Sequence, residues 1–272
     1  MSGRQRALED EPRVRYECEA GVASVTFDRP EKRNALTFSM QAAFASALDL
    51  AAADDSVHAV VVRGNGSTFC AGVDLQEMAE RHGEVDFEAD AARIREAARH
   101  WAKLWELPKP VIVKAHGHCV GWGLEIALNA DMLLASTDCR FHFPSIRLGT
   151  GLPDSAMAIY HLGPQWAKRL LLTGDAIDGR TAERIGLALV ALPEEQLEDE
   201  IQALTRSLCE VPLDLLSESK AVLNRAVELM GRDPLQVFSE LANATVRRNP
   251  RVDAWSRSAS SGKSAKTREP KS

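Results

Sequence analysis

The sequence predicts an α/β fold. Two short apolar runs, Ala59–Arg63 and Val111–Lys114, have the character of strands buried on both faces. Segments in which apolar residues recur at helical spacing alternate with these runs. From Ser155 to Val246 the pattern is helical throughout, with breaks at glycine and proline. The alternation therefore predicts an α/β core, built as packed layers, that is followed by a helical C-terminal region.

Size and composition exclude several classes of protein. The 272 residues are 45% hydrophobic and 26% charged, which is typical of a globular protein whose core needs neither disulfide nor metal. The net charge of -6 gives no support for nucleic-acid binding, and no stretch approaches the ~18–20 apolar residues of a membrane span. The five cysteines are scattered and form no C-x-x-C pair, so we expect them to be free thiols in a reduced protein. The N-terminus is polar and has no signal-peptide core, so we expect a cytoplasmic protein.

The first elements are set by alternation, capping and turn residues. Two strands are expected to form a hairpin through Ala20-Gly21, and Thr37 or Ser39 is expected to cap the first helix. In chain order, the sequence predicts strands at Val14–Glu19 and Val22–Phe27, a helix from about Ser39 to Ala53, and the strand Ala59–Arg63.

The remaining elements are expected to complete one core. They are a short helix at 74–82, a longer helix at Phe87–Glu106, the strand Val111–Lys114, a helix at Leu124–Ala130, and strands at Met132–Ala135 and Arg140–Phe143. We expect the chain to divide into a flexible leader (1–12), an α/β core (13–190), a C-terminal helical region (191–255) and a disordered basic tail (256–272).

Two glycine-containing segments, Phe69–Leu75 and His116–Glu125, are the most informative about function. Each follows a predicted buried strand and leads into a predicted helix. Glycine lets the backbone turn sharply and lets a ligand approach closely. A helix N-terminus adds unpaired N–H groups and partial positive charge. Two such N–H groups aimed at one point would stabilise an oxyanion.

Together with their flanks, these segments resemble the crotonase (enoyl-CoA hydratase/isomerase) family over roughly residues 14–230. The flanking segments that carry the resemblance are Arg29–Leu36, Lys109–Val113, Asn129–Ala135, Phe141–Gly149, Leu171–Asp175 and Ala182–Leu187. The resemblance implies a crotonase-like spiral of β-β-α repeats with a C-terminal helical trimerisation region. It also implies an acyl-CoA substrate, with coenzyme A as part of the substrate and no prosthetic group, a role in fatty acid metabolism, and a homotrimer or a hexamer built as a dimer of trimers.

By this resemblance, the two oxyanion-hole N–H groups come from Val73 and Trp122. The family usually has glycine at the second position. A tryptophan in place of glycine keeps the backbone N–H. Its indole has three possible positions: it narrows the acyl pocket, lies outside the pocket, or packs in the core. The neighbouring loop residues expected to contact the substrate are Ala71, Asp74, Leu75 and Gly121.

Glu125 matches the first of the two glutamates that act as acid and base in the family's hydratases. The alternative to a catalytic role is a structural one, because the helix dipole stabilises a carboxylate in the first turn of a helix by about 0.3–1 kcal/mol. Ser145 stands where the second glutamate is expected, and a serine cannot act unaided as a general base at neutral pH. Asp154 is a candidate replacement, with a helix N-cap before Ala156 as the alternative.

Cationic and histidine side chains complete the candidates. Lys32 and Arg33 are expected to contact the phosphates of coenzyme A, or else to lie on a solvated turn. His118 and His142 are possible residues of the acyl pocket. His116 and His118 form an H-x-H pair without a convincing third ligand, so no metal site is expected.

Three functions stay open on the sequence alone. The first is an enoyl-CoA hydratase/isomerase type of reaction with Glu125 as acid/base. Isomerisation needs only one base and therefore fits this sequence better than hydration by two glutamates. The second is hydrolysis of a CoA thioester or a β-diketone using His142, His118 or Asp154. The third is a catalytically decayed acyl-CoA-binding protein. The intact Glu125 favours chemistry over binding alone.

Overall fold

The computed structural model describes most of the predicted core. The residues it describes are 13–81, 96, 99–100, 102–149, 152–153, 156–247, 249–252 and 254–255. The predicted leader 1–12 and tail 256–272 lie outside these residues, as do Asp154 and much of the helix predicted at Phe87–Glu106.

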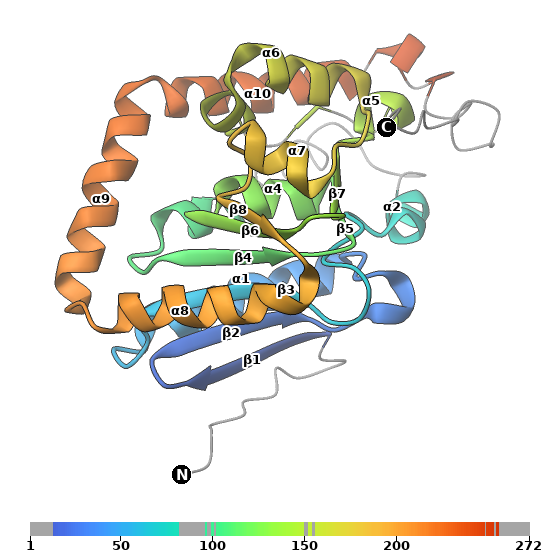
Figure 1. Cartoon of the computed structure of the whole chain (residues 1–272). Helices are drawn as coiled ribbons and strands as arrows, with labels where there is room; N and C mark the ends of the chain where they lie inside the picture. Colours follow the sequence, from blue (N-terminus) through green and yellow to red (C-terminus); the bar gives the residue numbers. More distant parts are fainter. Residues whose placement is uncertain are drawn as a thin grey trace.

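A six-stranded sheet, in the order β1-β2-β3-β4-β6-β8, forms the centre of the described part of the chain (Figure 1). Its strands are β1 (Val14–Glu19), β2 (Val22–Phe27), β3 (Ala59–Gly64), β4 (Val111–Ala115), β6 (Met132–Ser136) and β8 (Val190–Leu192). β1 pairs antiparallel with β2, which confirms the predicted hairpin, and every later neighbour is parallel. A sheet of mostly parallel strands with helical crossovers confirms the predicted α/β class.

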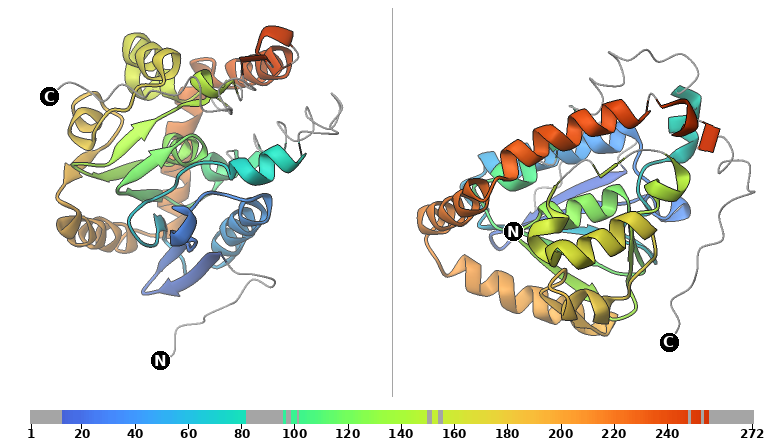
Figure 2. Two further views of the ribbon diagram at one scale, coloured as in Figure 1. Left: turned by 90° about the vertical axis from the view of Figure 1, so that its right-hand side faces the viewer. Right: turned by 90° about the horizontal axis from the view of Figure 1, so that it is seen from above.

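Helices cover both faces of this sheet, which is why its central strands read as continuous apolar runs. On one face, Val61 and Leu134 pack against α8 (Leu197–Cys209). The alternate residues of the same strands face α1 (Phe38–Ala53) and α4 (Trp122–Asn129) across the main core, as Figure 2 shows for the ribbon.

The other helices surround this core. They are η1 (Pro30–Lys32), α2 (Leu75–Arg81), α5 (Ser145–Leu148), α6 (Ala158–Thr173), α7 (Gly179–Arg184), η2 (Glu194–Gln196), α9 (Leu213–Leu229) and α10 (Arg232–Arg247). α9 runs along one side of the molecule, and α10 returns across it beside α6 (Figures 1 and 2). No helix within the described residues is long and apolar enough to cross a membrane.

Two short strands were not predicted from the sequence. β5 (His118–Val120) pairs in parallel with β7 (Arg140–His142) as a small second sheet. β8 extends the main sheet inside a segment whose pattern is helical, and it straddles the boundary expected at residue 190. Three residues are too few to show the periodicity of a strand. β5 is a strand only because it pairs with β7, and β8 only because it pairs with β6.

Candidate active site

The two glycine-containing loops lie side by side. Cys70 and Cys119 form an isolated parallel bridge. The Cys70 N–H donates to the His118 carbonyl, and the Val120 N–H donates to the Cys70 carbonyl, both at 3.0 Å. Because these are backbone bonds, the two loops are held together independently of their side chains.

Glycine at two positions permits this approach. Gly72 has φ +91°, and a β-carbon built there would lie 3.0 Å from the Val120 oxygen and 3.7 Å from the Trp122 nitrogen. A β-carbon at Gly123 would lie 2.7 Å from Cβ of Cys70, closer than non-bonded carbons pack. A larger residue at either position would separate the start of α4 from the first loop.

The Val73 N–H points away from Leu36, the residue with which Val73 forms an isolated parallel bridge. The Leu36 N–H donates to the Gly72 carbonyl at 2.7 Å, and the Asp74 N–H donates to the Leu36 carbonyl at 2.9 Å. The groups on either side of Val73 therefore face Leu36, and the Val73 N–H makes no hydrogen bond within the described part of the chain. This N–H is an available donor beside the N-terminus of α4.

A cavity of about 330 Å³ opens between these loops and α5. The residues expected to contact substrate that line it are Lys32, Ala71, Val73, Asp74, Leu75, Gly121, Trp122 and Ser145. Apolar residues that were not singled out from the sequence also line it, among them Met78, Phe143, Leu148 and Leu152. The cavity thus joins polar loop backbone to an apolar far wall.

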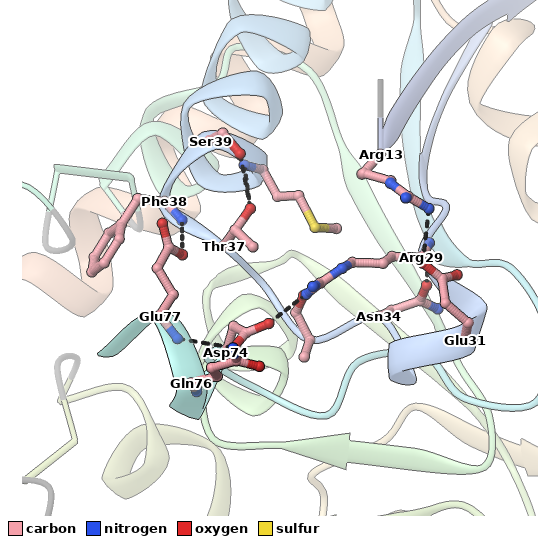
Figure 3. A network of polar contacts seen from close by, with 12 residues as sticks. Arg13, Arg29, Glu31, Asn34, Thr37, Phe38, Ser39, Asp74, Gln76 and Glu77 are labelled. Carbon is pink, nitrogen blue, oxygen red and sulfur yellow. Dashed lines mark hydrogen bonds and ion pairs between the residues drawn. The ribbon is translucent and has the colours of Figure 1, made fainter. Parts of the chain in front are cut away.

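Trp122 lines this cavity, and its indole packs against a second aromatic ring. Its side chain is only 9% exposed, and its ring meets the ring of Phe38 edge-on at 6.5 Å between centroids. The Phe38 N–H in turn donates to the Glu77 carboxylate at 2.9 Å (Figure 3). The indole of Trp122 therefore packs in the hydrophobic core beside α1, one of the three positions that the sequence left open, while its backbone remains at the start of α4.

Glu125 lies in the first turn of α4. Its N–H donates to the Gly121 carbonyl at 3.0 Å, and its side chain has 0% exposure. It is not among the residues that line the cavity, but it is one turn along the helix from Trp122, which does line it. Every residue of α4 is buried. The carboxylate therefore lies behind the cavity wall, within an otherwise largely apolar helix.

Asp74 lines the cavity but is already engaged by the protein (Figure 3). One carboxylate oxygen accepts from the Arg29 guanidinium at 2.6 Å. The other accepts from the Gln76 and Glu77 N–H groups at 3.0 and 3.1 Å, at the start of α2. The hydrogen bond from Arg29 is the main cause that holds the pKa of Asp74 below its ordinary value. Asp74 thus fixes the shape of the loop that carries Val73.

Asn34 organises the turn that brings Lys32 to the cavity. Its side chain is fully buried, and its backbone is left-handed at φ 54°. The amide oxygen accepts from the Arg29 N–H at 2.8 Å, and the amide nitrogen donates to the carbonyls of Asn65 and Thr68 at 2.9 and 2.7 Å. The neighbouring Arg33 is exposed and does not line the cavity. The sequence indicated this turn only as part of a longer motif.

His118 and His142 lie on the small β5–β7 sheet and do not line the cavity. Burial is the main cause that lowers the pKa of both, with that of His142 falling to about 4. Nearby positive charge, from Arg33 and Arg140 around His118 and from Arg147 near His142, acts in the same direction. Both imidazoles are therefore neutral at neutral pH.

The far wall of the cavity depends on α10, which the sequence did not connect with the site. The buried amide of Asn243 accepts from the Leu152 N–H at 3.2 Å and donates to the Leu152 carbonyl at 3.3 Å. Ser239, one turn earlier, donates to the Pro153 carbonyl at 2.9 Å. A residue 91 positions away in sequence thus holds Leu152 in the wall.

Comparisons with known proteins agree with this geometry. A family model described as enoyl-CoA hydratase/isomerase matches residues 17–251. The 2,3-dehydroadipyl-CoA hydratase of Escherichia coli K12 is 32% identical over 241 residues, covering 86% of this chain and 91% of that protein. Among solved structures, an enoyl-CoA hydratase/isomerase from Xanthobacter autotrophicus Py2 has a TM-score of 0.86 at 30% identity, covering 92% of this chain and 94% of that one.

An enoyl-CoA hydratase from Mycobacterium smegmatis has a TM-score of 0.83 at 32% identity, covering 92% of this chain and 89% of the other. The family match thus spans nearly all of the described core, including both glycine-containing loops. The chain belongs to the enoyl-CoA hydratase/isomerase family, within the crotonase superfamily.

Proposed function

We propose that this protein turns over CoA thioesters by stabilising their enolate form between the N–H groups of Val73 and Trp122, with Glu125 as the acid/base. The observation that carries the proposal is the Val73 N–H, which has no acceptor in the described structure and lies in a cavity wall beside the start of α4. A donor of this kind contributes about 3–4 kcal/mol to stabilising a transition-state oxyanion.

The charge that develops during the reaction explains the arrangement. When a proton leaves C2 of the acyl group, negative charge moves to the thioester oxygen. Fixed N–H donors stabilise that oxygen without reorganising at the moment of reaction. The N-terminus of α4, at Trp122, adds the positive end of a helix dipole. Gly72 supports this role because it allows the two loops to approach so closely.

Glu125 supplies the proton transfer in this proposal. For a 3-enoyl thioester, the carboxylate takes a proton from C2 and returns it to C4, so that the double bond moves to C2–C3 and no other atom is gained or lost. The carboxylate of Glu125 is buried one turn along α4 from Trp122, which lines the cavity. The full burial of Glu125 beside the cavity therefore supports a catalytic role.

Isomerisation is the preferred reaction because it needs one base. Hydration adds the hydroxyl group of one water molecule to C3 and the remaining proton of that water to C2, and the serine at position 145 lines the cavity where a second base would be needed. Hydration is the second candidate, since the Escherichia coli relative is named a hydratase. The substrate's coenzyme A would lie toward Lys32, at the loop side of the cavity.

We also propose that the chain forms a homotrimer or a dimer of trimers. Large apolar side chains are exposed on α9 and α10, among them Leu223 (70%), Leu229 (75%) and Phe238 (70%). Several large apolar side chains exposed on neighbouring helices are typical of interfaces between proteins. Sedimentation equilibrium of the purified chain tests this, and a monomer at micromolar concentration would contradict it.

A panel of CoA thioesters tests the proposed reaction. The enzyme is incubated separately with 2-enoyl, 3-enoyl and 3-hydroxyacyl thioesters, while conjugated enoyl absorbance and free thiol are followed. Gain of absorbance from the 3-enoyl thioester is expected and identifies isomerisation. Loss of absorbance from the 2-enoyl thioester identifies hydration instead.

Two results of the same panel would contradict the proposal. Thiol release without a change in the enoyl group would identify a hydrolase of CoA thioesters. Tight binding of every thioester without turnover, measured by calorimetry, would identify a binding protein that has lost its catalytic pair.

A further inference from the structure

The helix α5 contributes to the wall of the cavity but has little support of its own. It has four residues, Ser145–Leu148, and none of them is buried. Backbone bonds within this turn run from the Leu148 N–H to the Pro144 carbonyl at 3.1 Å and from the Gly149 N–H to the Ser145 carbonyl. Because nucleating a single helical turn costs free energy, contacts from outside α5 must hold it in place.

Arg147 ties α5 to the end of α6. Its Nε donates to the Thr173 carbonyl at 2.6 Å, and a terminal guanidinium nitrogen donates to the Asp175 carboxylate. The last carbonyls of a helix lack helical partners and carry partial negative charge, which favours a cation there. The Thr173 hydroxyl accepts from the Asp175 N–H at 3.1 Å, so the two acceptors are held together. A planar guanidinium that donates to both sets the direction of the contact as well as its length.

A second contact reaches the backbone of Arg147. The indole N–H of Trp255 donates to the Arg147 carbonyl at 2.9 Å, across 108 positions in sequence. This carbonyl lies in the last turn of α5, where carbonyl groups lack helical partners. Arg147 is therefore held through its side chain by α6 and through its backbone by the C-terminal part of the described chain.

The polar residue that α5 brings to the cavity is Ser145. It lines the cavity, and its neighbours Phe143, Pro144 and Leu148 in the same wall are apolar. A serine hydroxyl donates one hydrogen bond and accepts others. The placement of α5 therefore decides where the substrate meets a polar group on this side of the cavity.

We propose that Arg147 is a positioning residue for the reaction, which acts by holding Ser145 in the cavity wall across from the loop of Val73. The inference rests on the proposed function and adds how the second side of the site is built: Ser145 orients the reacting enoyl unit, and the two contacts of Arg147 place Ser145. Arg147 itself is not among the residues that line the cavity. Misplacing an orienting group by about 1 Å can cost on the order of 100-fold in rate.

Steady-state kinetics of Arg147→Gln provide the direct test, with the thioester that the wild type turns over best. kcat is expected to fall about 10- to 100-fold. KM should stay within about threefold, because coenzyme A lies on the loop side of the cavity. Arg225→Gln, which removes an exposed ion pair with Glu228 on α9, is the matched control and should keep the wild-type kcat. A wild-type kcat in folded Arg147→Gln would overturn the inference.

A double variant tests whether Arg147 acts through Ser145. Ser145→Ala should lower kcat to a similar extent as Arg147→Gln. In the Ser145→Ala background, Arg147→Gln should lower kcat by less than about threefold more, because the effects of residues that act as one unit do not add. A merely structural role of Arg147 would give independent effects that multiply. Multiplied effects, or a wild-type kcat in Ser145→Ala, would overturn the positioning role.

Two milder variants test the two contacts separately. Asp175→Asn keeps an acceptor but loses the charge, and it serves if Arg147→Gln does not fold. Trp255→Phe keeps an aromatic ring but loses the N–H. Each should lower kcat about three- to tenfold, the effect of one weakened hydrogen bond. If both variants keep the wild-type kcat, α5 is not placed by these contacts and the inference fails.

The possible results separate this inference from the proposed function. Turnover by the wild type together with a wild-type kcat in Arg147→Gln would overturn the role of Arg147 and leave the reaction intact. Absence of both turnover and binding for every thioester in the wild type would contradict the proposed function, and this inference with it.

Discussion

The two walls of the cavity are built in different ways. The loop wall, with Val73 and Trp122, is held by backbone hydrogen bonds between two loops and by glycine at the contact. The far wall at Leu152 is held by one buried side chain, Asn243, from a distant helix. The shape of the first wall therefore depends on backbone contacts, and that of the second wall depends on a side chain.

Replacing Glu125 should give the largest effect and should not distinguish short from long acyl chains. Glu125→Gln keeps the size of the side chain but removes the base, so kcat is expected to fall about 10²- to 10⁴-fold on every substrate. Steady-state kinetics on four- and eight-carbon thioesters measure it. Glu183→Gln, on α7 outside the cavity, is the control. Equal rates for wild type and Glu125→Gln would remove Glu125 from the mechanism.

The Val73 N–H can be removed by proline. Because this N–H has no partner in the described structure, Val73→Pro is expected to cost mainly transition-state stabilisation, about 10²- to 10³-fold in kcat. Val73→Ala keeps the N–H and should stay within a few-fold of wild type. Circular dichroism confirms that each variant is folded. If the folded proline variant is as active as the alanine variant, Val73 is not an oxyanion donor.

Substitution of Asn243 tests the second wall. Asn243→Ala leaves the Leu152 backbone without its partners, so it should lower the free energy of unfolding by about 1–3 kcal/mol. It should also reduce kcat/KM more for the eight-carbon than for the four-carbon thioester. Asn224→Ala, which removes a hydrogen bond of α9 to the Trp105 carbonyl, is the matched control. If Asn243→Ala and Asn224→Ala change the ratio of eight-carbon to four-carbon kcat/KM equally, the second wall has no special role in fitting the acyl chain.

The smallest expected effect concerns acid stability of the loop wall. The folded-state pKa of Asp74 lies below its ordinary value of 3.8, mainly through Arg29. Its ionised form therefore stabilises the fold above that ordinary value, and the contribution is lost as pH falls through the folded-state pKa. Asp74→Asn keeps an acceptor for the N-terminus of α2 but loses the charge, so it should cost about 1–2 kcal/mol at pH 7.

That difference should be smaller at pH 3 than at pH 7, as measured by urea unfolding at both pH values. Asp49→Asn is the control, because Asp49 pairs with Lys103 on the exposed surface and should contribute little. A gap between Asp74→Asn and wild type that is the same at both pH values would show that the charge of Asp74 is not its source.

Local patterns account for what the sequence could predict. The bounds of β1 and β2 were predicted residue for residue, and Thr37 caps α1 by accepting from the Met40 N–H at 3.2 Å, because alternation and capping act over a few residues. The resemblance to the family identified both loops in advance. The loops could be placed because glycine and the following helix lie within one short segment.

Long-range contacts account for what could not be predicted. The role of Asn243 depends on a contact across 91 positions, and an asparagine in a helix carries no sign of such a partner. β5 is a strand only because β7 pairs with it, so the sequence could not show that His118 and His142 would share a small sheet away from the cavity lining. Asp154 lies outside the described residues, and its role stays a prediction.

The tie between Asn243 and Leu152 has a consequence for synthesis of the chain. Ribosomes add about 5–20 residues per second, so Asn243 emerges on the order of ten seconds after the loop that begins α4. In that interval Leu152 and Pro153 lack their hydrogen bonds to α10, although both glycine-containing loops are already made. This part of the cavity wall can therefore reach its final position only after α10 has been made.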